Sequence, residues 1–327
     1  MKAMVTGGGG FLGGAIVRRL IKEGHQVRSF ARGDYLHLAK LGVDVVRGDL
    51  GDAEAVDRAC VGMDIVFHSG AKAGVWGRYE DYHLANVDGT KNVIESCRRH
   101  AVGKLVYTSS PSVVFNGRDL EGIDESAPIP AHFEAHYPTT KAIAERLALA
   151  ADGPELSVTA LRPHLIWGPG DNHLFPRIVA RFKEGRLYRI SGPPKLVDSV
   201  YIDNAVDAHM LAAAKLGPGA ACAGKAYFIA QGEPMPLWDL VDGMLKAAGL
   251  GQVTKTMSPR AAYNIGWALE VVYGALGMDR EPPLTRYVAG ELSTAHWFDL
   301  TAAKRDLGYK PGVSTAEGLK RLAESLR

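Results

Sequence analysis

The sequence has few cysteines and almost no net charge. Its three cysteines, Cys60, Cys97 and Cys222, are far apart in the chain and form no CxxC motif, so we expect reduced core thiols of a cytoplasmic protein. The chain has 38 Lys and Arg against 36 Asp and Glu, a formal charge of +2. A charge this small gives no long-range attraction for phosphates, so we expect no nucleic-acid partner.

The sequence also lacks a long hydrophobic run. A membrane-spanning helix needs about 20 apolar residues, and the most apolar late segment, 263–278, is interrupted by Asn264 and Glu270. The N-terminal residues do not show the charged n-region, apolar h-region and small-residue cleavage site of a signal peptide, so we expect no secretory signal. We expect segment 263–278 to pack on its own lobe, with a weak peripheral contact to a membrane surface as the alternative.

Short runs rich in Val and Ile alternate with longer amphipathic stretches such as 11–23 and 87–100. Parallel strands need crossover helices, so this alternation predicts an α/β fold with a Rossmann-type, doubly wound parallel sheet. The predicted strands cover residues 3–5, 26–30, 44–46, 65–68, 105–108 and 158–161.

A glycine-rich loop, TGGGGFLG at residues 6–13, follows the first predicted strand and precedes a helix. Glycine lets the backbone approach a pyrophosphate, and the N-terminus of the helix directs free N–H groups at that anion. Gly8, Gly10 and Gly13 fit GxGxxG, whereas Gly7, Gly10 and Gly13 fit GxxGxxG. The order of strand, loop and helix predicts a dinucleotide site, but the spacing does not choose between the two forms.

The end of the second predicted strand indicates which dinucleotide binds. An acidic residue there would hold the adenosine ribose, but the sequence has Ala31-Arg32-Gly33. Arg32 offers a permanent positive charge to a 2′-phosphate, so we expect NADP(H) to be preferred over NAD(H). After the third strand, Asp49 and Leu50 are candidates to contact the adenine, although Asp49 could simply cap the next helix.

The regular alternation of predicted strands and helices ends after Pro169. We therefore predict an NADP-binding Rossmann domain over residues 1–171 and a smaller, mainly substrate-binding C-terminal lobe over 172–327. Residues 226–229 read as one more buried strand, so the segment 198–231 is expected to return to the sheet domain.

Two features predict chemistry at this site. Tyr137 and Lys141 are four residues apart, which places both on one face of a helix. A nearby ammonium would lower the pKa of the phenol toward the range of a useful acid or base. Ser110 follows the fifth strand, at the sheet edge where ligands of open α/β sheets bind, and could orient a carbonyl. Ser109 is the alternative for this role.

The glycine loop, the strand-end serine and Tyr-x-x-x-Lys, in this order, resemble the short-chain dehydrogenase/reductase superfamily. LRP…GPG at 161–170 and DLT…LGYKP at 299–311 are similar to its extended branch, which favours the GxxGxxG form. VYTSS at 106–110 and YIDNA at 201–205 resemble the 3β-hydroxysteroid dehydrogenase-like group of that branch.

This resemblance implies roles for individual residues. Carbonyl polarisation falls to Ser110, general acid/base catalysis to Tyr137, and ribose binding and control of the tyrosine pKa to Lys141. The resemblance also adds Asn86 as support of the site and Pro163 beside the nicotinamide. The cofactor-binding candidates are Gly7, Gly10, Phe11, Leu12, Gly13, Arg32, Asp49, Leu50, Asn86, Tyr137, Lys141 and Pro163.

The resemblance also implies a substrate class. Residues 71–77, 140–145 and 165–171 are similar to the members that act on 2-alkyl-3-oxoalkanoic (β-keto) acids. The implied reaction is NADPH-dependent reduction of the ketone of a large apolar substrate to a secondary alcohol. Substrate-contact candidates are Lys72, Trp76 and His164. The aromatic and Met residues of the later chain, which we expect to be mostly core, are Trp167, Phe175, Phe182, Trp238, Tyr263, Trp267, Tyr273 and Met278.

Other functions fit parts of the pattern. A 3β-hydroxysteroid dehydrogenase, a nucleotide-sugar epimerase or dehydratase with tightly held NAD, and a non-enzymatic NADP-sensing regulator are the alternatives. His68, His164 and His173 share no element with metal-ligand spacing, so no metal is expected. The resemblance implies a homodimer or a complex with a pathway enzyme.

Overall fold

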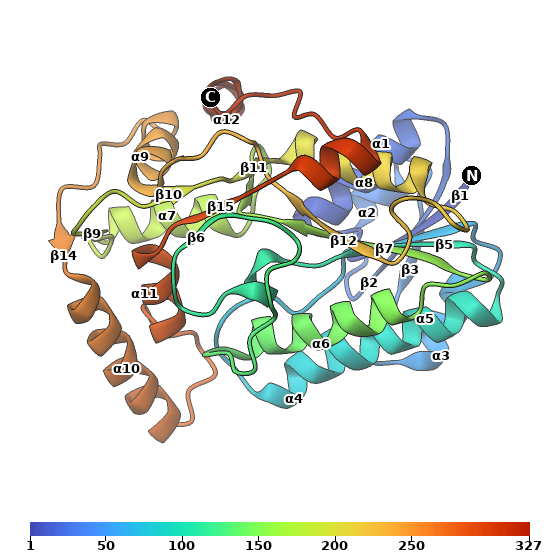
Figure 1. The fold of residues 1–327 in the computed structure, drawn as a ribbon, viewed down its shortest axis with the longest axis horizontal. Helices are drawn as coiled ribbons and strands as arrows, with labels where there is room; N and C mark the ends of the chain where they lie inside the picture. The colour runs from blue at the N-terminus through green and yellow to red at the C-terminus, as the bar shows by residue number, and fades with distance from the viewer.

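A seven-stranded parallel sheet forms the centre of the computed structural model, which describes all residues 1–327 (Figure 1). The strand order is β12-β7-β5-β4-β1-β2-β3. These strands are β1 (Lys2–Thr6), β2 (Gln26–Ala31), β3 (Asp44–Arg47), β4 (Ile65–His68), β5 (Lys104–Thr108), β7 (Ser157–Pro163) and β12 (Lys225–Ile229). The predicted α/β class and every predicted strand are confirmed, including the late one at 226–229.

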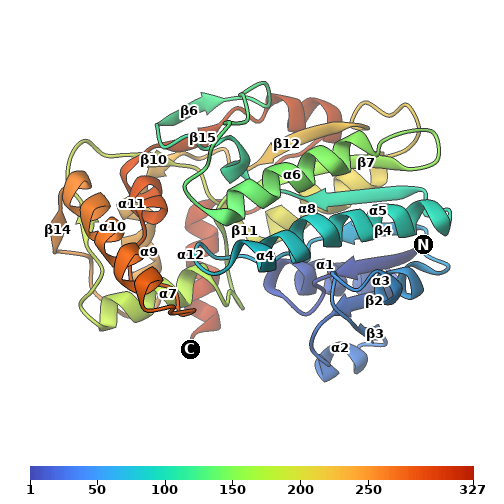
Figure 2. The same ribbon diagram turned by 90° about the horizontal axis from the view of Figure 1, so that it is seen from below.

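Helices cover both faces of this sheet, because strands buried on two sides need an apolar layer on each. On one face α1 packs against α8, and on the other α3, α5 and α6 pack side by side (Figures 1 and 2). The helices of this lobe are α1 (Phe11–Lys22), α2 (Leu36–Ala39), α3 (Ala53–Cys60), α4 (Tyr79–Tyr82), the π-helical turn η1 (His83–Asp88), α5 (Gly89–Arg99), the 3₁₀ turn η2 (Pro111–Val114), α6 (His136–Ala150) and α8 (Ile202–Lys215).

A second group of elements lies at one end of the sheet (Figure 2). Its helices are α7 (Leu174–Lys183), α9 (Leu237–Ala247), α10 (Pro259–Ala275) and α11 (Arg286–Ser293). A small sheet has the order β13-β10-β15-β6, from β13 (Met235–Pro236), β10 (Leu196–Val197), β15 (His296–Phe298) and β6 (Leu120–Ile123). Two further pairs join β8 (Ile166–Trp167) to β11 (Val200–Tyr201) and β9 (Arg189–Ile190) to β14 (Thr256–Met257); the chain ends with η3 (Ala303–Leu307) and α12 (Thr315–Ser325).

The strand order places a ligand crevice. Chain connections run outward in opposite directions from β1 and β4, so a crevice is expected at the carboxyl ends of these two strands. Gly7, after β1, and Gly70, after β4, meet there: a Cβ on Gly7 would lie 2.8 Å from the Gly70 Cα. The predicted glycine loop therefore lies at the switch point of the sheet.

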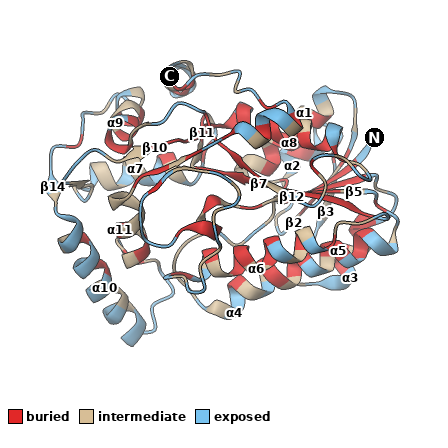
Figure 3. Ribbon diagram, in the orientation of Figure 1, coloured by how far each residue is buried: buried red, intermediate tan, exposed pale blue.

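Helix α10 differs from the expectation of a packed helix. Trp267 is 54% exposed and Leu276 68% exposed, and the helix is largely exposed along its length in Figure 3. Tyr263 and Met278 are exposed as well, so these residues form neither a core nor the wall of an enclosed pocket. None of the helices combines the length and the apolar character that crossing a membrane requires.

The cysteines are free and buried, as expected. Cys60 on α3 and Cys97 on α5 are nevertheless neighbours in space, because these two helices pack together. A hydrogen bond with Cys60, together with burial, raises the pKa of the Cys97 thiol well above its usual value. The Cys97 thiol therefore stays protonated and unreactive.

Candidate functional site

The glycine loop has the geometry of the GxxGxxG form. Gly7 has a φ of +67°, and its carbonyl accepts a hydrogen bond of 2.8 Å from the Gly10 N–H. A Cβ on Gly13 would lie 2.2 Å from that same Gly7 carbonyl oxygen, so only glycine fits there. Gly10 begins α1 without a side-chain cap, which leaves the amides of Phe11 and Leu12 free for an anion. The loop therefore fits a dinucleotide pyrophosphate.

The region expected to bind adenosine contains one free positive charge. Arg32 is exposed and forms no ion pair. The nearby Asp34 lies 3.7 Å from Arg47, which partly neutralises it. Tyr35, which the sequence analysis missed, covers the loop: a Cβ on Gly9 would lie 2.2 Å from its ring. Its left-handed backbone, with a φ of 30°, gave no sequence signal.

Asp49 and Leu50 lie beside the same crevice. Asp49 is exposed, and its carboxylate accepts a 2.9 Å hydrogen bond from the Gly51 N–H, whereas the cap of α3 is Asp52. The Leu50 side chain packs between Gly70 and Gly89, at the rim of the loop after β4. Leu50 is therefore the better placed of the two to contact a flat ring.

Ser110 and Tyr137 meet at the carboxyl end of β5. Ser110 caps the turn η2, where its Oγ accepts a 3.2 Å hydrogen bond from the Ser112 N–H. Tyr137 lies in the first turn of α6. Burial raises the pKa of Tyr137, and a hydrogen bond with Ser110 lowers it. Ser110, and not the buried Ser109, is thus the hydroxyl that contacts the phenol.

Lys141 is held by the main chain. Its Nζ donates a 2.6 Å hydrogen bond to the Thr108 carbonyl and lies 4.3 Å from the centre of the Tyr107 ring. Burial lowers the pKa of Lys141 to about 7. The Lys141 ammonium is directed at the end of β5, and burial and Ser110 are what shift the pKa of Tyr137, so the expected lowering of that pKa by Lys141 stays a prediction.

Asn86 joins three elements around the site. It lies in the π-helical turn η1, and its side-chain carbonyl accepts a 2.7 Å hydrogen bond from the Lys72 N–H. Its amide donates to the Lys72 carbonyl at 3.1 Å and to Thr140 Oγ1 at 3.0 Å. Asn86 therefore fixes the loop after β4 against the first turns of α6.

The two proposed substrate contacts in the loop after β4 already have partners. The Lys72 ammonium forms a 2.8 Å ion pair with Asp81, which offsets the charge that a substrate carboxylate would need. The Trp76 indole donates a 2.8 Å hydrogen bond to the Met278 carbonyl and meets Tyr273 edge-on. The loop is thus joined to the end of α10 in this structure.

Pro163 and His164 lie at the carboxyl end of β7, the longest strand of the sheet. Pro163 is buried and pairs with Ile229 of β12. His164 follows it, and its Nδ1 lies 2.7 Å from the Asp198 carbonyl. Burial, more than the neighbouring His296, lowers the pKa of His164 to about 4.

Tyr287 of α11 is a further residue that the sequence analysis missed. Burial raises its pKa well above the usual value, the charge of Glu291 and the nearby Tyr137 raise it further, and a hydrogen bond with Ser112 lowers it. Tyr287 therefore extends from α11 toward the catalytic candidates. No motif indicates it, since its place depends on a contact between distant segments.

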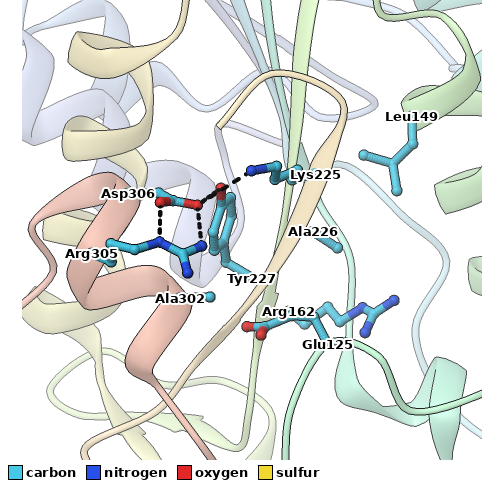
Figure 4. Close-up of a pocket in the computed structure, with 9 residues that line it drawn as sticks. All are labelled: Glu125, Leu149, Arg162, Lys225, Ala226, Tyr227, Ala302, Arg305 and Asp306. Atoms are coloured by element: carbon cyan, nitrogen blue, oxygen red, sulfur yellow. Dashed lines mark hydrogen bonds and ion pairs between the residues drawn. The ribbon is translucent and has the colours of Figure 1, made fainter. Parts of the chain in front are cut away.

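A cavity of about 390 Å³ lies away from these residues, along the edge strand β12 (Figure 4). Tyr227 donates a 2.8 Å hydrogen bond to Asp306, which also pairs with Arg305 at 2.6 Å. Lys225 lies 3.7 Å from the same carboxylate. The Asp306 carboxylate is thus held by Tyr227, Arg305 and Lys225, so the group reads as a structural network rather than a second catalytic centre.

Comparison with known proteins gives consistent results. The sequence profile of the 3-beta hydroxysteroid dehydrogenase/isomerase family matches residues 4–260. The chain is 51% identical to the 2-alkyl-3-oxoalkanoate reductase of Stenotrophomonas maltophilia (strain K279a), with 99% of each chain covered. It is 48% identical to that of Shewanella oneidensis (strain MR-1), with 99% of this chain and 86% of the relative covered. The solved structure of MoeE5 in complex with UDP-glucose and NAD matches with a TM-score of 0.75 and 25% identity, over 99% of this chain and 98% of MoeE5. The resemblance stated from the motifs is confirmed.

Proposed function

The chain belongs to the 3-beta hydroxysteroid dehydrogenase/isomerase family and is thus an NAD(P)-dependent oxidoreductase of the extended short-chain dehydrogenase/reductase type; we propose that it reduces the ketone of a 2-alkyl-3-oxoalkanoic acid to the secondary alcohol. The observation that carries this proposal is the meeting of Ser110 with Tyr137 at the end of β5. It is joined there by Lys141, which contacts the last carbonyl of the same strand.

Each residue of this group has a chemical task. The Ser110 hydroxyl donates a hydrogen bond to the ketone oxygen and polarises the carbonyl. The Tyr137 phenol, whose raised pKa keeps it protonated, transfers its proton to that oxygen. The bound reduced nicotinamide supplies the hydride that the carbonyl carbon requires. Lys141 binds the ribose, and with its positive charge there it stabilises the phenolate that proton transfer leaves on Tyr137.

Residues of the crevice support a preference for NADP(H). The free amides that begin α1 would hold the pyrophosphate of a bound dinucleotide, and Leu50 would pack on its adenine. Arg32 carries the only unpaired charge near the end of β2, where no carboxylate would repel a 2′-phosphate. The fold alone does not select NADP(H), since MoeE5 has the same fold and is bound to NAD. The preference for NADP(H) therefore depends on side chains such as Arg32.

Two observations support the substrate class. Relatives that are 51% and 48% identical over nearly the whole chain bear the name 2-alkyl-3-oxoalkanoate reductase. Tyr287 of α11 lies near Tyr137, and Phe115, the residue after η2, meets the Tyr287 ring edge-on at 5.8 Å. These two buried rings make the surroundings of Tyr137 apolar, which suits a large apolar substrate.

The proposal is tested by NADPH consumption with a panel of 2-alkyl-3-oxoalkanoic acids, 3-ketosteroids and UDP-sugars. We expect turnover of the β-keto acids, with kcat/KM rising with chain length. Tyr137→Phe should lower kcat by about 10²–10⁴-fold, because the proton donor is lost. NADPH binding to this variant, measured by fluorescence, should stay within about twofold of wild type.

Preference for ketosteroids would assign the chain to the dehydrogenase that gives the family its name. Conversion of UDP-sugars without added cofactor would indicate an epimerase. Binding of NADPH with no turnover of any substrate would indicate a sensor. Wild-type activity of the Tyr137→Phe variant would remove Tyr137 from the mechanism.

A further inference from the structure

Three side chains from distant parts of the chain meet beside the proposed catalytic group. His164 follows β7, Glu291 lies on α11 and His296 lies on β15. One potential ligand atom from each lies within 4.8 Å of the others. His164 is 6% exposed and His296 3% exposed, so water solvates neither imidazole well. The proposed reduction uses none of the three.

The partner of His164 fixes its tautomer. The Asp198 carbonyl, 2.7 Å from Nδ1, can only accept a hydrogen bond, so Nδ1 carries the hydrogen. The Nε2 lone pair is then the one that His164 can offer. A histidine that donates one ring N–H to a backbone carbonyl while its other nitrogen binds an ion is the usual arrangement at metal sites.

His296 is oriented in a similar way. The Thr294 hydroxyl lies 2.7 Å from His296 Nε2 and 2.8 Å from the Gly290 carbonyl. A hydroxyl has one hydrogen, and the carbonyl needs it, so both contacts form together only if Nε2–H donates to Thr294. This leaves Nδ1 facing the Glu291 carboxylate, with its Oε2 at 3.5 Å.

The separation of these two atoms suits a shared cation. Two ligands that each lie about 2.0–2.2 Å from a tetrahedral ion are roughly 3.4 Å apart. A direct imidazolium–carboxylate hydrogen bond would instead be about 2.7–2.9 Å long. The Tyr287 hydroxyl donates a hydrogen bond to the Glu291 carboxylate from outside the cluster. In these tautomers the two imidazole lone pairs and the carboxylate are all acceptors, which a cation can join.

We propose that His164, Glu291 and His296 bind one divalent transition-metal ion of the zinc class. Imidazole with carboxylate is a donor set that such ions take. This revises the expectation of no metal, which considered only histidines on a shared element. The ion joins α11 and β15 to the end of β7, and so holds Tyr287, one helical turn before Glu291, near Ser112 and Tyr137. Three protein ligands leave a fourth position for water or another oxygen donor.

Cobalt(II) is the probe, because its visible d–d bands report nitrogen and oxygen ligation directly. Untagged enzyme, stripped with EDTA, is titrated with Co²⁺ in the absence of substrate. We expect one equivalent to bind with d–d absorption, and Zn²⁺ to displace it. The isosteric Glu291→Gln and the variant His164→Gln should each weaken binding by at least about tenfold. The matched control is His173→Gln, an exposed histidine outside the cluster, which should bind as the wild type does.

Metal loading should also raise the melting temperature of the wild type and not of Glu291→Gln. The proposal is overturned if wild type binds less than a stoichiometric amount, or if Glu291→Gln and His164→Gln, shown to be folded by NADPH binding, retain wild-type affinity. Because no substrate is present, failure here leaves the proposed reduction untouched.

Discussion

At the residue scale, Lys141 illustrates how burial changes a charged group. The ammonium is 3% exposed and has one backbone carbonyl and one aromatic ring as partners. Removing it from water lowers its pKa from 10.5 to about 7, so the folded enzyme holds this proton less tightly than the unfolded chain does. The lysine is therefore ready for a negatively charged or hydroxyl-rich partner in the crevice.

This shift predicts a pH-dependent difference between the wild type and Lys141→Met. Between pH 7 and about 10 the unfolded chain binds the proton and the folded enzyme does not, so raising the pH stabilises the wild type. The free energy of unfolding of the wild type should rise relative to the variant by about 1.4 kcal/mol per pH unit at most. Urea unfolding at several pH values measures it, and a constant difference would contradict the assigned pKa.

Arg32 gives a second prediction at this scale. Arg32→Ala should raise the KM for NADPH by about tenfold or more, since one charge-assisted contact is worth roughly 1.5–3 kcal/mol. The KM for NADH should change little, because that cofactor has no 2′-phosphate. Steady-state kinetics with both cofactors measures the effect, and Arg47→Ala, which alters a neighbouring charge, is the control. Equal changes for the two cofactors would exclude Arg32 from cofactor choice.

How well residues of the site could be predicted depended on their spacing. Ser110, Tyr137 and Asn86 belong to short motifs, and local motifs are visible in a sequence. Tyr287 and Glu291 reach the site only because α11 packs near η2, and nothing in their own sequence records that contact. Lys72 was predicted as a substrate contact, but in the structure it forms an ion pair with Asp81. Asp81 is only nine residues away in the sequence, yet no motif indicates that the two side chains pair.

At the element scale, the glycine loop shows why three glycines are required at a spacing of three. Gly7 has a left-handed backbone, and Gly13 lies so close to the Gly7 carbonyl that no side chain fits at position 13. The first turn of α1 is thereby brought close to the end of β1. Its free amides can then point together into the crevice.

Gly13→Ala tests this packing. Its Cβ would lie 2.2 Å from the Gly7 carbonyl, so the loop must move, at a cost of about 1–3 kcal/mol, and NADPH affinity should fall at least tenfold. Gly274→Ala is the matched control, because Gly274 is also helical and has open space around it. The control should be neutral or stabilising by up to about 1 kcal/mol. Denaturant unfolding and NADPH titration compare them, and equal effects would remove the steric argument.

Elements with strong periodicity were predictable, and those without it were not. The strands of the large sheet are buried on both faces, which gives continuous Val- and Ile-rich runs. The two-residue strands β8 to β11, β13 and β14 are too short to show any period. Helix α10 has a clear apolar pattern, yet it is exposed, because periodicity indicates an apolar side and not the surface that covers it.

At the scale of the whole molecule, the two lobes share one hydrophobic core. The same cluster of buried residues contains Val5 and Leu161 of the large sheet and Trp238 and Leu245 of α9. It crosses the boundary predicted near residue 171. We therefore expect the enzyme to unfold in one cooperative transition rather than lobe by lobe.

Substitution of one buried and one exposed tryptophan tests the shared core. Trp167 is fully buried and donates a 2.9 Å hydrogen bond to Ser199, so Trp167→Ala should destabilise the enzyme by about 3–5 kcal/mol. Trp267→Ala, at an exposed position on α10, should change stability by about 0.5 kcal/mol or less. Fluorescence and circular dichroism during urea unfolding measure both. Separate transitions by the two probes, or similar losses in both variants, would contradict a shared core.

The π-helical turn η1 carries Asn86 in the middle of a run of helix from α4 to α5. Such a turn accommodates one residue more than a regular helix does. A wide turn takes up this residue by turning less per residue, so the helices before and after it keep nearly the same angular relation. Removing one position from residues 83–88 would restore regular winding and redirect Asn86 itself, while the flanking helices stay in place. The surplus residue thus aims one side chain at two partners, one 14 and the other 54 positions away in the chain.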